Sequence, residues 1–341
     1  MELGIIAKSD IKKFIELLRK DRRVYAPINR KGRILFAEVS SADDVQLEYG
    51  NTDLSPKGLF FPQCETICTF KGDELLNAPQ ATETRVVFGM RPCDALALSH
   101  LDRIFSQGNL NDPYWLARRE NAVIISIACS DPLDSCFCTS VGGGPCQTTG
   151  SDVMAYPLDT TLLFEALTEK GRLLLKAASS LLIKPKGPQD KTKKDFESAA
   201  KKKVPPLNLD NLKENLRNSF HSPLWGTITE KCLGCGVCAY LCPTCHCFDV
   251  TDQIAGEGGR RIRSWDSCQY SLFTLHASGH NPRPSKKERM RQRILHKFLY
   301  APDNYSETFC VGCGRCVRSC PVNLDIRENV VHFSTLNGTG A

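Results

Sequence analysis

The sequence contains one cysteine pattern twice, as CLGCGVCAYLCP at residues 232–243 and as CVGCGRCVRSCP at residues 310–321. Bacterial two-cluster ferredoxins bind [4Fe–4S] clusters with this spacing, and their fourth cysteine, which precedes a proline, binds the other cluster. The pattern therefore predicts two [4Fe–4S] clusters that exchange their fourth ligands. The expected ligands are Cys232, Cys235, Cys238 and Cys320 for the first cluster, and Cys310, Cys313, Cys316 and Cys242 for the second.

A glycine stands on each side of the second cysteine in both copies, at Gly234 and Gly236 and at Gly312 and Gly314. Glycine lets the backbone approach a cluster closely, because it has no Cβ. Disulfides or structural zinc are alternative uses of so many cysteines. Zinc needs four thiolates per site, but it does not require a cysteine run that ends in proline and occurs twice with the same spacing. The repeat therefore favours iron–sulfur clusters, and a zinc-dependent structural or nucleic-acid-binding protein is the alternative.

Composition bounds the class of protein. A chain of 341 residues with 41% apolar residues is long enough for two or three packed domains. Its 18 cysteines, several of them spaced for metal, are typical of a reducing compartment. The longest strongly apolar run, Ala122–Ala128, is too short to cross a bilayer. We expect a soluble cytoplasmic protein of anaerobic metabolism with no membrane span.

The formal net charge of +6 counts every cysteine as a neutral thiol. An oxidised cubane with four thiolates carries roughly −2, so two clusters reduce the total to about +2. The charge is therefore weak support for a nucleic-acid partner, and we expect none. Residues 284–299 form a predicted basic amphipathic helix with Arg293 and Lys297 at helical spacing. That helix is interpreted as an exposed face, a docking face for an acidic redox partner, or a group of charges that offsets the clusters.

The first half alternates predicted strands and helices. A helix is expected at Ile11–Leu18, strands at Arg85–Met90 and Ala122–Ala128, and a long helix at Thr160–Leu182. Several cysteines follow the two strands, where α/β layers place their sites. A third iron–sulfur site is one interpretation of them, and buried, inert thiols are the other. The residues chosen for that site are Cys93, Cys129, Cys136 and Cys138.

The fold is expected to begin with an α/β or α+β domain at residues 1–183, which carries the third site. A connector rich in Lys and Pro follows at 184–206. Residues 207–341 are expected to form a mostly helical dicluster ferredoxin-like [4Fe–4S] domain with about seventy inserted residues between the two motifs. No sequence fingerprint of a flavin or nucleotide site is present.

The inserted region contains Cys245, Cys247 and Cys268. These cysteines are interpreted as alternative ligands, as a separate metal site, or as residues that donate weak hydrogen bonds to cluster sulfur, and the last interpretation is favoured. If they formed an open metal site, the chain would be an enzyme by itself, which is a further alternative. We predict no catalytic residues on this chain.

Seven motifs together resemble one known family. They are GMRPCD at 89–94, DPYW at 112–115, CFCTS at 136–140, CPTCHCFDV at 242–250, WDSC at 265–268, HNPRP at 280–284 and CVGCGRC at 310–316. The sequence from Leu59 to Ile326 resembles the family that comprises the iron–sulfur subunits of anaerobic sulfite reductases and the β subunits of sulfhydrogenases, which are cytoplasmic NiFe hydrogenases.

The resemblance implies an electron-transfer subunit of a multi-subunit oxidoreductase. Its implied partners are an NAD(P)H-linked flavoprotein reductase subunit and a terminal catalytic subunit such as a sulfite reductase or a NiFe hydrogenase. It also favours the third iron–sulfur site, because Cys93, Cys136 and Cys138 lie inside family-like motifs. Cys64, Cys68 and Cys146 match no motif and are left out of the ligand set. A freestanding ferredoxin-like carrier is the alternative.

Overall fold

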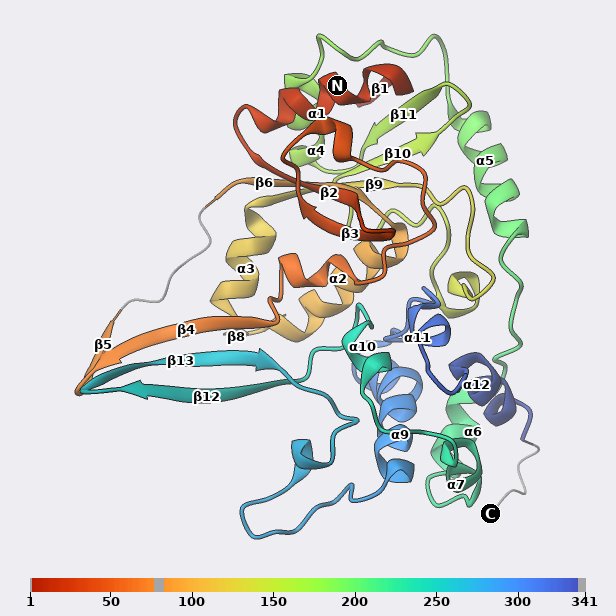
Figure 1. Cartoon of the computed structure of the whole chain (residues 1–341). Coiled ribbons are helices and arrows are strands. Elements are labelled where there is room, and N and C mark those ends of the chain that lie inside the picture. The colour runs from red at the N-terminus through yellow and green to blue at the C-terminus, as the bar shows by residue number, and fades with distance from the viewer. Residues whose placement is uncertain (1, 77–82, 337–341) are drawn as a thin grey trace. The chain divides into compact units, whose positions relative to one another are not determined.

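The structure is a computed structural model that describes residues 2–76 and 83–336 (Figure 1). Its internal contacts divide the chain into two compact units, which we describe separately. The first unit comprises Met1–Pro56, Thr82–Pro206 and Val311–Cys313. The second unit comprises Lys57–Ala81, Leu207–Cys310 and Gly314–Ala341.

A seven-stranded sheet in the order β1-β11-β10-β9-β6-β2-β3 forms the centre of the first unit. The four inner strands β10, β9, β6 and β2 run parallel, and antiparallel partners border them on both sides. The strands are β1 (Leu3–Ala7), β2 (Arg23–Arg30), β3 (Arg33–Glu38), β6 (Arg85–Met90), β9 (Ala122–Ile127), β10 (Val153–Pro157) and β11 (Thr161–Ala166). The expected strands at 85–90 and 122–128 are thus confirmed as β6 and β9.

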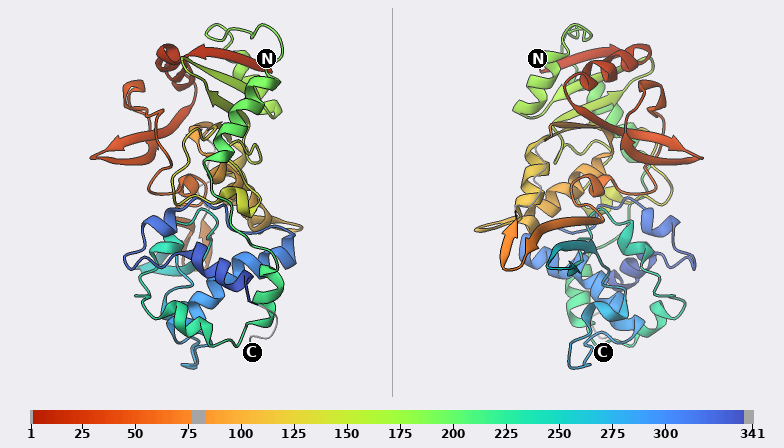
Figure 2. Two further views of the ribbon diagram at one scale, coloured as in Figure 1. Left: turned by 90° about the vertical axis from the view of Figure 1, so that its right-hand side faces the viewer. Right: turned by 60° about the vertical axis from the view of Figure 1, so that its left-hand side comes forward.

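Helices pack on this sheet through apolar side chains. The expected helix at Ile11–Leu18 is confirmed as α1, and its Phe14 ring stacks on Phe164 of β11 with 5.2 Å between centroids. Helix α5 runs beside β10 (Figure 2). Its Phe196 ring meets the edge of the Tyr156 ring of β10. The helices are α1 (Ile11–Arg19), α2 (Pro92–Phe105), α3 (Pro113–Glu120), α4 (Glu169–Ala177) and α5 (Asp190–Lys202).

The long helix expected at Thr160–Leu182 is wrong for its first part. Residues Thr161–Ala166 form strand β11, which pairs antiparallel with both β1 and β10. Leu162, Leu163 and Phe164 are consecutive and all buried, which a strand covered on both faces allows. The helix α4 begins only after Thr168, whose hydroxyl accepts a hydrogen bond from the Gly171 amide at 3.3 Å.

The second unit combines short helices with a four-stranded antiparallel sheet in the order β12-β13-β4-β5. The strands are β4 (Cys64–Lys71), β5 (Glu74–Leu76), β12 (Phe248–Ala255) and β13 (Gly258–Trp265). The helices are α6 (Leu212–Asn218), α7 (Leu224–Thr229), α8 (Val237–Tyr240), α9 (Lys286–Leu295), α10 (Ala301–Tyr305), α11 (Arg315–Arg318) and α12 (Ile326–Ser334). None of the helices in the described part of the chain has the length and apolar character needed to span a membrane.

This division differs from the expected boundaries at two places. Strands β4 and β5 come from residues expected in the first domain, yet β4 pairs with β13. A buried ion pair fixes this pairing, because Arg263 of β13 donates to Glu65 of β4 at 2.6 and 2.9 Å. The expected connector at 184–206 contains α5 and belongs to the first unit.

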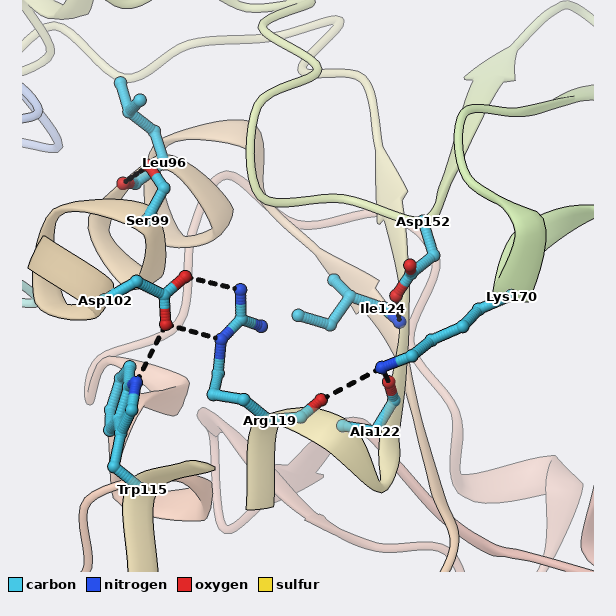
Figure 3. Close-up of polar contacts among 9 residues, drawn as sticks. All are labelled: Leu96, Ser99, Asp102, Trp115, Arg119, Ala122, Ile124, Asp152 and Lys170. Atoms are coloured by element: carbon cyan, nitrogen blue, oxygen red, sulfur yellow. Dashed lines mark hydrogen bonds and ion pairs between the residues drawn. The ribbon is translucent and has the colours of Figure 1, made fainter. Parts of the chain in front are cut away.

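A polar network fastens α3 to α2 in the first unit (Figure 3). Asp102 of α2 accepts two hydrogen bonds from Arg119, both 2.9 Å long. It also accepts one from the indole nitrogen of Trp115 at 2.8 Å. Lys170 of α4 donates to backbone carbonyl oxygens at the end of α3, among them that of Glu120 at 2.8 Å. The network therefore holds the residues that lead into β9.

We predict that Asp102→Ala lowers the free energy of unfolding by about 1–3 kcal/mol, because it removes a charged acceptor from the buried Trp115 indole. The matched control is Arg172→Ala, which breaks an exposed ion pair with Glu169 and should cost about 0.5 kcal/mol or less. Urea unfolding of the iron-loaded protein measures both variants. Equal losses in the two variants would contradict a stabilising role for the network.

Candidate iron–sulfur sites

The four cysteines expected at the first cluster meet at one cavity of the second unit. Cys232 and Cys235 line it from the loop that leads into α8, Cys238 lines it from α8, and Cys320 lines it from the loop after α11. Cys316 of α11, which is expected at the second cluster, lines this cavity too. The cavity holds about 560 Å³ of atom-free space, part of it open to solvent. Cys320 is 78 residues from Cys242 in the sequence, yet it faces the first motif. This arrangement is the one that exchanged fourth ligands require.

The two motifs fold alike. Gly234 and Gly312 have φ of 69° and 60°, and Gly236 and Gly314 have φ of 74° and 72°. All four values lie in the left-handed region, where a side chain is strained. Backbone amides also point at sulfur, since Leu324 N donates to Cys320 Sγ at 3.2 Å. Such amides stabilise a thiolate, so the loops suit bound clusters.

Of the four expected ligands of the second cluster, Cys242, Cys310 and Cys316 lie in the second unit, and Cys313 lies in the segment Val311–Cys313 of the first. Within the second unit, a buried lysine connects residues near two of them. Lys297 Nζ donates to Cys242 Sγ at 3.2 Å, to Thr244 Oγ1 at 2.8 Å and to the carbonyl oxygen of Phe309 at 2.9 Å. The Thr244 hydroxyl donates to the same carbonyl at 2.7 Å. Cys242 is thereby tied to the residue that precedes Cys310.

Charge around Cys242 favours the thiolate that a cluster needs. A hydrogen bond from the Cys245 thiol holds the pKa of Cys242 well below its usual range against the effect of burial, and Lys297 and Arg293 lower it further. The same contact raises the pKa of Cys245. Of this pair, Cys242 is the residue whose thiolate is favoured, as its predicted role as a ligand requires, and Cys245 is the hydrogen-bond donor.

Cys247 and Cys268 form a second pair at the base of the β12–β13 hairpin. Asp266 N donates to the carbonyl oxygen of Cys247 at 3.0 Å, which brings the two ends of the hairpin together. A hydrogen bond from the Cys247 thiol lowers the pKa of Cys268 to about 6, although burial acts in the opposite direction. Neither cysteine lines the cavity of the first cluster.

The four cysteines chosen for the third site also meet at one cavity, within the first unit. Cys93 lies in the first turn of α2, Cys129 follows β9, and Cys136 and Cys138 come from the next loop. Cys313 lines the same cavity, which holds about 370 Å³ of atom-free space. Burial raises the pKa of Cys129, and it raises that of Cys138 to about 12. Binding metal there must therefore release protons.

Across residues 2–76 and 83–336, no three His, Cys, Asp or Glu side chains gather closely enough to hold one metal ion. A [4Fe–4S] cluster binds one thiolate at each of its four irons, so its ligands lie farther apart than the ligands of a single metal ion. Each of the two cavities is lined by five cysteines, which is enough for the four thiolates of a cluster. Of the cysteines left out of the ligand set, Cys64 and Cys68 lie in β4 and Cys146 lies in the first unit, and none lines either cavity.

Comparison with known proteins decides the family. The profile of the 4Fe-4S dicluster domain matches residues 231–324, which include both cysteine motifs. Sulfhydrogenase 2 subunit beta of Pyrococcus furiosus is 32% identical over 314 residues, which cover 92% of each chain. The chain belongs to the sulfhydrogenase β-subunit family. It is therefore an iron–sulfur electron-transfer protein with a C-terminal 4Fe-4S dicluster domain.

In this member of the sulfhydrogenase β-subunit family, the positions of Arg293 and Lys297 favour one of the three interpretations of the basic helix, charges that offset the clusters. The basic helix at 284–299 was expected to be an exposed face among other interpretations, yet these side chains are 3% and 4% exposed. Arg293 donates to Cys245 Sγ at 3.3 Å and to the carbonyl oxygen of Cys238 at 2.7 Å. The signal that identifies them is a basic residue every fourth position shortly before the second motif.

We predict that double variants reveal the exchange of ligands in this family member. Cys242→Ser and Cys313→Ser should each remove one cluster, and together no more than one, because both residues belong to the same site. Cys242→Ser with Cys235→Ser should remove both clusters. Iron and sulfide content of the anaerobically purified proteins measures this. Loss of both clusters in the Cys242→Ser/Cys313→Ser protein would contradict the assignment.

Proposed function

We propose that this chain relays single electrons, in the cytoplasm, between an NAD(P)H-linked flavoprotein subunit and a catalytic subunit such as a sulfite reductase or a NiFe hydrogenase. The observation that carries the proposal is the cavity at which Cys232, Cys235, Cys238 and Cys320 converge. Two [4Fe–4S] clusters are the proposed cofactors, on the ligand sets given above. The printed name of the Pyrococcus furiosus relative, a β subunit, supports partner subunits.

The residues fit such clusters. The cavity offers the four expected ligand thiols, with Cys316 as a fifth, an otherwise mostly apolar lining and amides aimed at sulfur. These features suit a [4Fe–4S] cluster, which when bound would supply a one-electron redox couple. The chain's own residues hold the thiolates at fixed positions and supply compensating charge. Fixed positions matter because electron transfer is fast only when little has to move.

A third iron–sulfur site is part of the proposal. Cys93, Cys129, Cys136 and Cys138 converge at the cavity of the first unit. The segment that bears Cys313 packs on it, since Phe137 N donates to the carbonyl oxygen of Gly312 at 2.9 Å. A Cβ on Gly312 would lie 2.4 Å from Cys138 N, so this approach requires glycine. The contact supports a third cluster as part of the same relay.

We predict that Cys129→Ser removes the iron of one cluster and leaves the spectra of the two dicluster-domain clusters unchanged, because Cys129 lies outside residues 231–324. Cys146→Ser is the matched control, as a partly buried thiol of the first unit that lines no such cavity. Iron analysis and Mössbauer spectroscopy measure the difference. An unchanged iron content in the Cys129→Ser protein would contradict the third site.

We predict that the native protein, purified without oxygen, brings a flavoprotein and a catalytic subunit with it. Flavin with nickel indicates a hydrogenase, and flavin with sirohaem a sulfite reductase. Within that complex, Cys235→Ser should stop the transfer of electrons from NAD(P)H to the catalytic subunit, because one site of the relay is lost.

A protein that purifies alone and brown would contradict the fixed complex and favour a freestanding ferredoxin-like carrier. A colourless protein with zinc would favour the structural or nucleic-acid-binding alternative. Substrate turnover by the isolated chain would indicate an enzyme that needs no partner.

A further inference from the structure

Two buried cations on one helix each lie beside the ligands of a different cluster. Helix α9 continues into a π-helical turn at His296–Tyr300, and Arg293 and Lys297 stand four residues apart along it. Both side chains are almost fully buried. Burying a charged side chain is costly unless an opposite charge or good acceptors compensate it. The groups around each side chain therefore identify the anions whose charge it compensates.

Lys297 contacts an expected ligand of the second cluster, Cys242. Its ammonium group has three N–H bonds, and it has three acceptors, Cys242 Sγ, Thr244 Oγ1 and the carbonyl oxygen of Phe309. Its own carbonyl oxygen accepts from Phe309 N at 3.0 Å. Hydrogen bonds therefore fix both the side chain and the backbone carbonyl of Lys297, beside Cys242 and beside Phe309, which precedes Cys310.

Arg293 contacts an expected ligand of the first cluster directly and reaches Cys242 of the second through Cys245. Its guanidinium donates to the carbonyl oxygen of Cys238, an expected ligand, and to Cys245 Sγ. Arg293 also lines the cavity at which Cys232, Cys235, Cys238 and Cys320 meet. Arginine keeps its charge at every working pH, so this positive charge at the cavity wall is permanent.

We propose that Arg293 and Lys297 set the reduction potentials of the two clusters, Arg293 chiefly that of the first and Lys297 chiefly that of the second. The inference rests on the proposed function, since it assumes clusters at both motifs. Reduction adds one negative charge to a cluster. A fixed cation within a few ångströms, at low local dielectric, stabilises the reduced form more than the oxidised form. A hydrogen bond to a ligand sulfur acts in the same direction. Both residues are positioning residues, because they act through the ligands.

The test compares reduction potentials by EPR-monitored titration of the iron-loaded protein. Lys297→Met should shift the redox equilibrium of the second cluster about tenfold toward the oxidised form, or about 59 mV for one electron, and the first cluster less. Arg293→Met should do the reverse. The Cys235→Ser protein, which should lack only the first cluster, identifies the signal of that cluster by its absence.

The matched control is Arg291→Met on the same helix. Arg291 stacks on the Phe220 ring at 3.9 Å and donates to the Phe220 carbonyl oxygen, away from both motifs, so its loss should leave both potentials unchanged. Lys297→Arg and Arg293→Lys keep the charge and should restore the potentials. A structural role alone would not produce this dependence on charge.

Unchanged potentials in fully loaded Lys297→Met and Arg293→Met proteins would overturn the inference, as would equal shifts of both clusters in each. If a Met variant fails to bind iron, pulsed EPR of the unmodified protein with ¹⁵N-lysine gives the answer. We expect a nitrogen coupling to the second cluster that Lys297→Arg abolishes, and its absence would contradict the inference. An unmodified protein without iron for both clusters would instead overturn the proposed function.

Discussion

Each cubane needs four thiolates, and in the proposed assignment the fourth thiolate of each motif binds at the other motif's site. That requirement brings residues 232–243 together with residues 310–321, although the hairpin β12–β13 and the helix α9 lie between them in sequence. In the second unit, hydrogen bonds among Lys297, Thr244 and Phe309 connect the end of the first motif to the start of the second. Cys320, at the end of the second motif, lines one cavity with the cysteines of the first.

Compensation of charge follows from the same requirement. Thiolates gathered in a low-dielectric interior repel one another unless cations lie near them. Arg293 and Lys297 supply two such cations, and Lys57 supplies a third, with Nζ donating to the Cys245 carbonyl oxygen at 2.7 Å. Burial lowers the pKa of Lys57 to about 8, and the neighbouring Cys245 and Cys242 act in the opposite direction. The net charge of +6 thus partly reflects charges held inside the protein.

The cysteine spacing predicted the dicluster domain because ligand geometry is local and leaves a fixed pattern in the sequence. Strands β6 and β9 and helix α1 were also predictable, since their apolar residues repeat at the period of a strand or helix. Strand β11 was not predictable, because its apolar residues run directly into those of helix α4 and together resemble one long helix. Only the pairing with β1 and β10 distinguishes the strand. The joining of β4 to β13 depends on Glu65 and Arg263, which are about 200 residues apart. The burial of Arg293 and Lys297 depends on anions that only the folded chain assembles.

The most direct test of the account is the anomalous diffraction of iron from anaerobically grown crystals of the loaded protein. The account predicts two compact four-iron peaks in the dicluster domain. One should lie beside the sulfurs of Cys232, Cys235, Cys238 and Cys320, and the other beside those of Cys310, Cys313, Cys316 and Cys242. Single-ion peaks, or a four-iron peak with Cys320 bound to the same cluster as Cys310, Cys313 and Cys316, would contradict it.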